Sequence, residues 1–193
     1  MNGVHAIVLA AGSGSRFGGG KLMAPWRGGV LLDGALDAAF AASPAVRVVV
    51  GADPAASAHA QARGAMIVEA KDHALGLSAS LKAGIAALPK DAAGALVFLG
   101  DMPLVPHAVL APLILALESG APAAVPTFDG RIGNPAALSA RLFGQVMALE
   151  GDRGARALIE ALGGALVRIP APDAGVLYDV DRPEDLHPGA LST

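Results

Sequence analysis

Short apolar segments and longer alanine-rich segments alternate along the first half of the chain. The apolar segments lack the polar alternation of a half-exposed strand and are bounded by Gly, Pro or Asp, so they predict strands buried on both faces. Their ranges are Val4 to Leu9, Val46 to Val50, Ala65 to Val68 and Ala95 to Leu99. The alanine-rich segments predict helices at Leu31 to Ala42, Pro54 to Ala62 and Ser78 to Leu88. Buried strands alternating with helices indicate the α/β class.

The second half of the chain continues this alternation less regularly. Its predicted elements are a helix near Pro106 to Leu117, a strand near Ala123 to Pro126, a loop from Asp129 to Pro135, helices at Ala140 to Leu149 and Gly154 to Leu162, and a strand at Ala165 to Ile169. No linker, repeat or low-complexity segment divides the chain. We therefore expect a single domain over residues 1–193.

Composition and charge exclude several classes of protein. The net charge is only -3 and charged residues make up 16% of the chain, so a polycation that binds nucleic acid is not expected. The absence of cysteine excludes a disulfide scaffold, a thiolate nucleophile and a cysteine-bound metal. Apolar stretches such as Val109 to Leu117 are about half of the roughly 20 residues that span a membrane. Because Met1 to Leu9 is not a signal peptide, we expect a cytoplasmic protein.

A glycine-rich loop follows the first predicted strand and ends at Lys21. Such a loop at the carboxyl end of a buried strand lies where α/β sheets bind ligands, and its backbone N–H groups can bind phosphate. It is not a dinucleotide fingerprint, because Phe17 occupies the third glycine position, and it is not a P-loop, because Leu22 replaces the hydroxyl residue. A flexible loop with solvated charges is the alternative to a phosphate site.

The loop carries the signature L-A-A-G-x-x-x-R-x-G-x-x-K at every spacing. It resembles the nucleotidyltransferase superfamily, and specifically the molybdenum cofactor cytidylyl- and guanylyltransferases. Small residues would let the backbone approach a nucleotide, while the two cations would hold a triphosphate. The residues expected to bind the nucleotide here are Leu9, Ala10, Ala11, Gly12, Gly14, Arg16 and Lys21.

A carboxylate follows the strand at Ala95 to Leu99, in the tetrapeptide that runs from Gly100 to Pro103. Asp101 would lie at the same sheet edge as the glycine-rich loop, and Mg²⁺ is typically held by one or two carboxylates plus substrate phosphates. The alternative is that Asp101 caps the next helix. The tetrapeptide also resembles the one that the same family has at this place, which favours a metal ligand.

Two further candidate ligands, Asp179 and Asp181, lie in the segment Tyr178 to Leu186, which resembles the closing motif D-[IV]-D-T-P-E-D of that family. Alternation places Asp179 and Asp181 on one side of an extended segment. The resemblance implies that Asp181 shares Mg²⁺ with Asp101 and that Asp179 lies next to the metal site. Helix capping is the alternative, because Asp181 precedes Pro183 and two acidic residues.

Weaker resemblances extend the expected site. Gly76 and Ser80 lie in a segment that the family places beside the nucleotide base, where Ser78 is also expected to cap a helix. Asn134 stands where the cytidylyltransferases usually have His, as a contact to the pterin. Arg153 and Arg156 are spaced to share one helix face and to hold the phosphate of the acceptor, unless that face is simply solvated.

The resemblance implies an α/β, Rossmann-like three-layer nucleotidyltransferase fold (GT-A-like), with a mostly parallel sheet and helices on both faces. It also implies transfer of a nucleoside monophosphate to the terminal phosphate of molybdopterin with release of pyrophosphate. Lys21, Arg16 and Asp101 are the expected catalytic residues and Mg²⁺ the expected cofactor. CTP is favoured over GTP because Ala10 and Ala11 follow the cytidylyl form.

Other functions stay open at this point. They are a sugar-phosphate nucleotidyltransferase, a glycosyltransferase that uses the D-x-D at Asp179 to Asp181, and a non-catalytic carrier of the molybdenum cofactor. The expected partners are a nucleoside triphosphate, a molybdopterin-type phosphate acceptor and a molybdenum hydroxylase or dehydrogenase apoenzyme. Neither nucleic acid nor a membrane is an expected partner.

Overall fold

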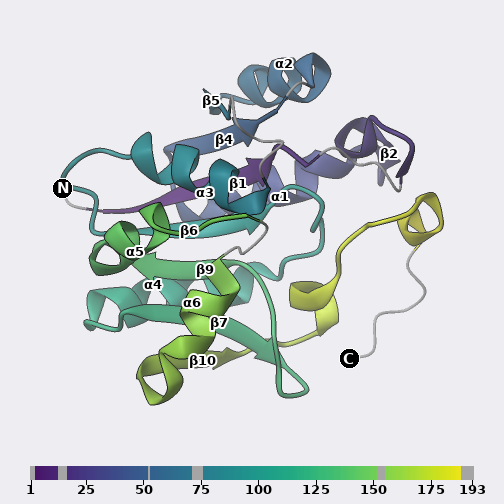
Figure 1. Cartoon of the computed structure of the whole chain (residues 1–193). Helices are drawn as coiled ribbons and strands as arrows, with labels where there is room; N and C mark the ends of the chain where they lie inside the picture. Colours follow the sequence, from purple (N-terminus) through teal and green to yellow (C-terminus); the bar gives the residue numbers. More distant parts are fainter. Residues whose placement is uncertain (1–2, 13–16, 52, 71–75, 152–154, 188–193) are drawn as a thin grey trace.

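The protein forms a three-layer α/β structure around one mixed sheet (Figure 1). The computed structural model describes residues 3–12, 17–51, 53–70, 76–151 and 155–187. The strands along the sheet follow the order β10-β7-β9-β6-β1-β4-β5, and β8 pairs with β7. Their bounds are β1 Val4–Ala10, β4 Val46–Val50, β5 Met66–Glu69, β6 Gly94–Leu99, β7 Ala123–Phe128, β8 Arg131–Ile132, β9 Ala136–Ser139 and β10 Leu166–Pro170.

Most neighbouring strands of this sheet are parallel. β1 pairs in parallel with both β4 and β6, β4 pairs in parallel with β5, and β10 pairs in parallel with β7. Only β9, inserted between β6 and β7, runs antiparallel to both of its neighbours along this path. The carboxyl ends of β1, β6 and β7 therefore meet at one edge of the sheet.

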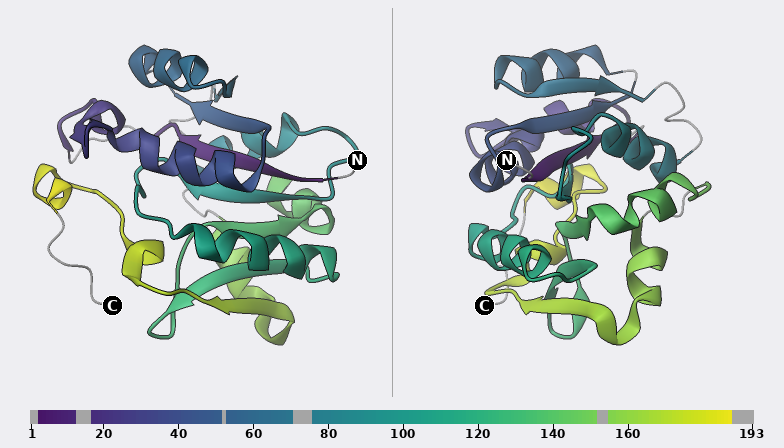
Figure 2. Two further views of the ribbon diagram at one scale, coloured as in Figure 1. Left: turned by 180° about the vertical axis from the view of Figure 1, so that it is seen from behind. Right: turned by 90° about the vertical axis from the view of Figure 1, so that its left-hand side faces the viewer.

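Helices cover both faces of the sheet, as the right-hand view of Figure 2 shows. One face carries α1 Leu31–Ala42, α2 Pro54–Ala62 and α4 Leu110–Glu118. The other carries α3 Leu77–Ala86, α5 Phe143–Met147 and the described helix α6 Ala155–Ala161. Along β1, Ala6 and Val8 face the first layer while Ile7 and Leu9 face the second, which explains why the strand has no polar alternation.

Short irregular elements complete the chain. They are the 3-10 helices η2 Lys21–Met23, η4 His107–Val109, η5 Ala140–Leu142, η6 Gly163–Ala165, η7 Ala174–Leu177 and η8 Pro183–Leu186, and the hairpin strands β2 Pro25–Trp26 and β3 Gly29–Val30. The segment after β10 crosses back toward this hairpin, as the yellow ribbon in Figure 1 shows. There Val180 is buried in a small apolar cluster with Trp26 and Leu31.

The sequence predicted most of the regular elements correctly. The strand at 46–50 and the helices at 31–42 and 54–62 have the predicted bounds. The predicted strand at 65–68 begins one residue later and lies at the sheet edge, so the expected burial on both faces is wrong there: Met66 is 47% exposed. The predicted cap Ser78 is also wrong, because α3 begins at Leu77 and its N-cap is Gly76 with φ 107°.

The second half differs more from the prediction. The loop expected at 129–135 contains β8, and β9 was not predicted. The helix expected at 140–149 consists of a 3-10 turn and a five-residue α-helix, and the helix expected at 106–117 likewise begins with a 3-10 turn. β9 has the sequence Ala-Ala-Leu-Ser, whose local preference is weak, so its pairing between β6 and β7 decides its conformation. Among the described residues, no helix is both long and apolar enough to cross a membrane.

Candidate functional site

The ends of β1 and β6 bring two loops together at the carboxyl edge of the sheet. Leu9 pairs with Leu99, and the N–H of Gly100 donates to the carbonyl oxygen of Leu9 over 2.9 Å. A Cβ on Gly100 would lie 3.2 Å from that oxygen, so a side chain there would crowd the two backbones. The glycine-rich loop and Asp101 consequently leave the sheet side by side.

The described part of the glycine-rich loop changes from buried to exposed as it leaves β1. Leu9, Ala10 and Ala11 are buried, whereas Gly12 is exposed. The small side chains leave the exposed backbone accessible for close approach by a ligand. Gly14 and Arg16, which were also expected to bind the nucleotide, lie outside the described residues.

Lys21 begins η2 after three glycines. Gly18, Gly19 and Gly20 have φ of 89°, 95° and 62°, a left-handed region that residues with a Cβ rarely adopt. η2 packs against α1 through the buried side chain of Leu22. This arrangement fixes the backbone of Lys21, whose side chain is only 11% exposed.

The ammonium group of Lys21 contacts two carboxylates from distant parts of the chain. Its Nζ lies 2.7 Å from Oδ2 of Asp101 and 3.5 Å from Oδ1 of Asp181. The backbone supports this convergence, because the N–H of Val180 donates to the carbonyl oxygen of Asp101 over 3.0 Å. The structure thus brings together three of the residues expected in the site, which we call the Lys21 group: Lys21, Asp101 and Asp181.

A third carboxylate, Asp179, adds negative charge beside the Lys21 group. Neighbouring protein partly desolvates this otherwise exposed side chain, and that desolvation is the main reason why the pKa of Asp179 is raised. The charges of Asp181 and Asp101 raise the pKa further, and Lys21 opposes the shift. Excess negative charge of this kind favours binding of an additional cation.

The two carboxylates of the Lys21 group fit a hard divalent cation. Both already share one cation, the ammonium group of Lys21, and both offer the oxygen ligands that Mg²⁺ prefers. In the part of the chain that the structure describes, no group of three or more His, Asp or Glu residues has the arrangement of a metal site. Asp101 and Asp181 would supply two of the ligands, and phosphate oxygens and water could complete the coordination.

The capping alternatives for these carboxylates are wrong. The next helical element after Asp101 is η4, whose N-cap is Pro106. The N-cap of η8 is Arg182, and the carboxylate that caps this element belongs to Asp185. Asp101 and Asp181 thus contact Lys21 without capping the elements that follow them.

The amino end of α3 lies at the same sheet edge. Its carboxyl end is fixed near the start of β4, because Nε of Arg47 donates to the carbonyl oxygen of Ala87 over 2.8 Å. Between these ends, a Cβ on Gly84 would lie 2.7 Å from the side chain of Ile7, so only glycine allows the helix to lie this close to β1. The helix therefore directs Gly76 and the buried Ser80 toward the edge where β1 ends.

The residues expected to contact the acceptor occupy two different places. Asn134 lies two residues before β9 at the edge where β6 ends, and its N–H donates to the carbonyl oxygen of Val176 over 2.8 Å. Arg156 lies on α6 with a side chain that is 72% exposed, and its Nε pairs with Glu160 over 2.9 Å. This is the geometry of a solvated helix face. Arg153 lies outside the described residues.

Two features of the site were not assigned from the sequence. Trp26 packs against Tyr178 with a ring-centroid distance of 6.4 Å and links the segment after Lys21 to the segment that carries Asp181. Asp185 accepts hydrogen bonds from backbone N–H groups. The sequence offers no signal for Trp26 beyond that of an ordinary packing residue. For Asp185 the signal is its place in the acidic first turn that follows Pro183.

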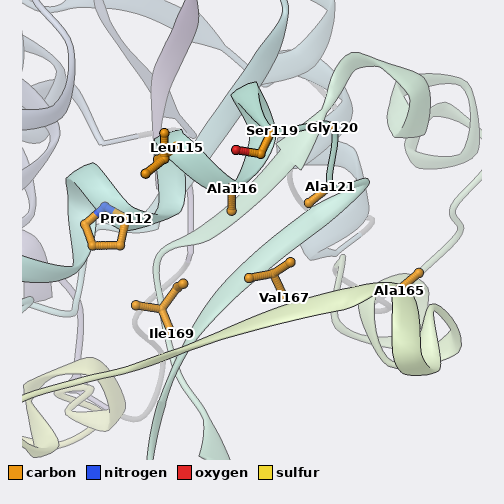
Figure 3. A pocket seen from close by; sticks show the side chains of 9 residues that line it. All are labelled: Pro112, Leu115, Ala116, Ser119, Gly120, Ala121, Ala165, Val167 and Ile169. Atoms are coloured by element: carbon orange, nitrogen blue, oxygen red, sulfur yellow. The ribbon is translucent and has the colours of Figure 1, made fainter.

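An apolar groove lies apart from these residues, between α4 and β10 (Figure 3). It has a volume of about 570 Å³, and its walls include Leu115, Val167 and Ile169. Its lining contains no ionisable side chain. The groove therefore lacks the charges that the candidate site concentrates around Lys21.

A mixed α/β sheet with a glycine-rich loop, a lysine and carboxylates at its carboxyl edge is suited to bind a phosphate-bearing ligand together with a divalent cation. Residues 6–166 match the family described as the MobA-like NTP transferase domain, and the chain belongs to this family. The protein is therefore a nucleotidyltransferase.

Similar proteins agree with this assignment. The chain is 26% identical over 189 residues to the molybdenum cofactor cytidylyltransferase of Escherichia coli (strain K12), covering 96% of this chain and 94% of that protein. It is 33% identical to the Rv0371c homologue from Mycobacterium sp. strain JC1, with a TM-score of 0.81 and coverage of 94% and 92%. Rv0371c from Mycobacterium tuberculosis H37Rv in complex with manganese is 27% identical, with a TM-score of 0.76 and 95% coverage of each chain.

Proposed function

We propose that this protein transfers CMP from CTP to the terminal phosphate of a molybdopterin-type acceptor and releases pyrophosphate. The observation that carries the proposal is the Lys21 group, in which the ammonium of a largely buried lysine contacts two carboxylates beside the glycine-rich loop. The similarity to a molybdenum cofactor cytidylyltransferase supports this choice of acceptor. We take residues 1–193 as one catalytic domain.

The reaction needs alignment and charge stabilisation rather than a protein nucleophile. A phosphate oxygen of the acceptor attacks the α-phosphorus, and the bond from that phosphorus to the bridging oxygen of the β-phosphate breaks. The electron pair of this bond leaves with pyrophosphate. Backbone N–H groups after Ala10, together with Arg16, orient the triphosphate, and Lys21 stabilises the charge that builds on the α-phosphoryl group and the leaving pyrophosphate.

Asp101 and Asp181 would hold Mg²⁺, which neutralises phosphate charge when it is bound. In the described structure Lys21 supplies the positive charge between these carboxylates. Lys21 would turn toward the triphosphate when a divalent cation takes over this charge. Asp179 contributes further negative charge beside the same position.

The substrates are placed on opposite sides of Asp101. On the β1 side, the loop from Ala10 and the amino end of α3, with Gly76 and Ser80, would hold the nucleotide and its base. On the β7 side, Asn134 precedes β9 and would contact the acceptor. Arg153 and Arg156 would bind the acceptor phosphate only if Arg156 left Glu160.

A panel of substrates tests this function. Pyrophosphate release would be measured with each nucleoside triphosphate and Mg²⁺, using either molybdopterin or a sugar 1-phosphate as the acceptor. Turnover with CTP and molybdopterin alone is the expected result. Turnover with GTP instead of CTP would show that the proposed base is wrong. Turnover only with sugar phosphates would show that the proposed acceptor is wrong, and no turnover with any pair would favour a carrier of the cofactor.

A further inference from the structure

The segment that carries Asp181 is held by one carboxylate. Oδ2 of Asp185 accepts a hydrogen bond from the N–H of Asp181 over 3.0 Å and another from the N–H of Arg182 over 2.8 Å. The hydroxyl of Tyr178 donates to the carbonyl oxygen of Asp185. These bonds close the chain from Tyr178 to Asp185 into a compact loop, and Asp181 is one of the residues of this loop.

This loop is also fixed to the remainder of the site. The side chain of Val180 is fully buried against Trp26 and Leu31, and the N–H of Val180 donates to the carbonyl oxygen of Asp101. Val180 therefore fixes one side of Asp181, and Asp185 fixes the other. These contacts hold the backbone on both sides of the Asp181 side chain.

Capping of η8 accounts for only part of this arrangement. The cap of η8 is the bond from the N–H of Arg182, which is its N-cap residue. The second bond goes outside the 3-10 helix, to the backbone of the residue whose side chain contacts Lys21. A carboxylate that only started the helix would not need this second bond.

We infer that Asp185 is a positioning residue that sets the place of the Asp181 carboxylate and thereby the affinity of the site for a divalent cation. This inference rests on the proposed function, because it takes Asp181 to be a metal ligand. In this inference Asp185 itself is not a metal ligand and would not contact the substrates. It acts through two hydrogen bonds to the backbone, in the way that residues behind a metal ligand orient it.

Three variants separate these hydrogen bonds from charge and from general damage to the segment. Asp185→Ala removes both acceptor oxygens. Asp185→Asn removes the charge but keeps an oxygen that can accept the same two bonds. Glu184→Gln is the matched control, because Glu184 is the adjacent acid in the same turn, is exposed, and pairs with Arg182 only at 3.8 Å.

The test measures binding of Mn²⁺ to the full chain by titration calorimetry, with and without CTP, and the Mg²⁺ dependence of pyrophosphate release. Asp185→Ala is expected to bind Mn²⁺ about 10-fold to 100-fold more weakly, the range for losing a residue that orients a metal ligand. Its turnover at saturating Mg²⁺ should stay within a few-fold of wild type. Asp185→Asn is expected to recover most of the affinity, and Glu184→Gln should match wild type.

Tyr178→Phe keeps the experiment informative if Asp185→Ala does not fold. It removes only the bond from the hydroxyl to the carbonyl oxygen of Asp185, so a smaller loss of Mn²⁺ affinity in the same direction is expected. Unchanged Mn²⁺ binding by a folded Asp185→Ala would overturn the inference and leave the proposed function standing. Equal losses in Asp185→Ala and Asp185→Asn would overturn it too, because charge would then be the cause. Failure of wild type to bind Mn²⁺ would instead overturn the metal site itself.

Discussion

Two regions of the molecule supply the Lys21 group, and they hold their residues in different ways. Asp101 and the loop to Lys21 leave the ends of paired parallel strands in the interior of the sheet. Asp181 comes from a segment without regular secondary structure, which is held by a small apolar cluster and a few hydrogen bonds. The sheet therefore fixes the part of the site assigned to the nucleotide, whereas local contacts fix the second carboxylate.

This difference suggests that catalysis and metal affinity can be perturbed separately. Substitutions at the strand ends should lower turnover, because they change groups held by the core. Substitutions in the returning segment should mainly change metal binding. Two experiments test this division, beginning with the larger expected effect, and a third concerns the stability of the fold around the site.

Lys21→Ala should lower turnover by about two to three orders of magnitude, the range for losing one preorganised electrostatic contact in a transition state. The measurement is pyrophosphate release at saturating CTP and Mg²⁺. Lys90→Ala is the matched control, because Lys90 is an exposed lysine in the turn before β6, at the opposite edge of the sheet. Activity of Lys21→Ala within a few-fold of wild type would remove Lys21 from the reaction.

Trp26→Ala and Phe98→Ala compare the apolar cluster of the returning segment with the core of the sheet. Phe98 is fully buried in β6, and its replacement should lower the free energy of unfolding by about 3–5 kcal/mol. Trp26→Ala should lower the free energy of unfolding less than Phe98→Ala does, because the apolar cluster around Trp26 is small. It should nevertheless weaken Mn²⁺ binding more than Phe98→Ala does. Thermal unfolding and Mn²⁺ titration of both variants check this. A larger loss of Mn²⁺ affinity in Phe98→Ala than in Trp26→Ala would contradict the assignment of metal binding to the returning segment.

The smallest expected effect concerns Asp33, whose carboxylate joins α1 to α2. Its Oδ1 lies 2.7 Å from Nε2 of His59 and also contacts Arg63, and its Oδ2 accepts from the N–H of Val30 over 2.9 Å. Burial alone would raise the pKa of Asp33, but these hydrogen bonds and charges outweigh it, so the pKa is lowered. The carboxylate therefore stabilises the folded state above its unfolded pKa of about 3.9 and loses this effect as the pH falls further.

Asp33→Ala should accordingly reduce the free energy of unfolding at pH 7 by about 1 kcal/mol, the usual worth of such a hydrogen bond. The difference from wild type should shrink in denaturant titrations between about pH 4 and pH 2. Asp37→Ala is the control, because Asp37 is exposed and contacts Arg63 alone among the ion pairs of this network. An undiminished difference at low pH would show that packing, not charge, makes Asp33 important.

The sequence predicted the parallel half of the fold well because its local and long-range signals agree. β4 is a continuous apolar strand, and α2 begins with Asp53 accepting from two backbone N–H groups and with Pro54 in the first turn. In the second half, the local preference of the residues no longer indicates the structure that pairing in the sheet imposes. β9 has small residues that fit several conformations, and only its two neighbours in the sheet make it a strand.

The residues of the candidate site and part of their arrangement were predicted, because the resemblance implied that Asp101 and Asp181 lie close enough to share a metal ion. Spacing along the chain placed Lys21 and Asp101 at one edge of the sheet, because both follow predicted strands. It could not reveal that Asp101 and Asp181 share the ammonium of Lys21, since this depends on a long return of the chain after β10. Likewise, the role of Trp26 depends on Tyr178, which lies far away in the sequence.

The contact between Lys21 and Asp181 spans 160 positions of the chain, and this separation sets an order of events during synthesis. A nascent chain that has emerged as far as β7 carries the glycine-rich loop and Asp101, but its second carboxylate has not yet been translated. The proposed site therefore becomes complete only after the segment that carries Asp181 has been synthesised and Val180 has packed against Trp26 and Leu31.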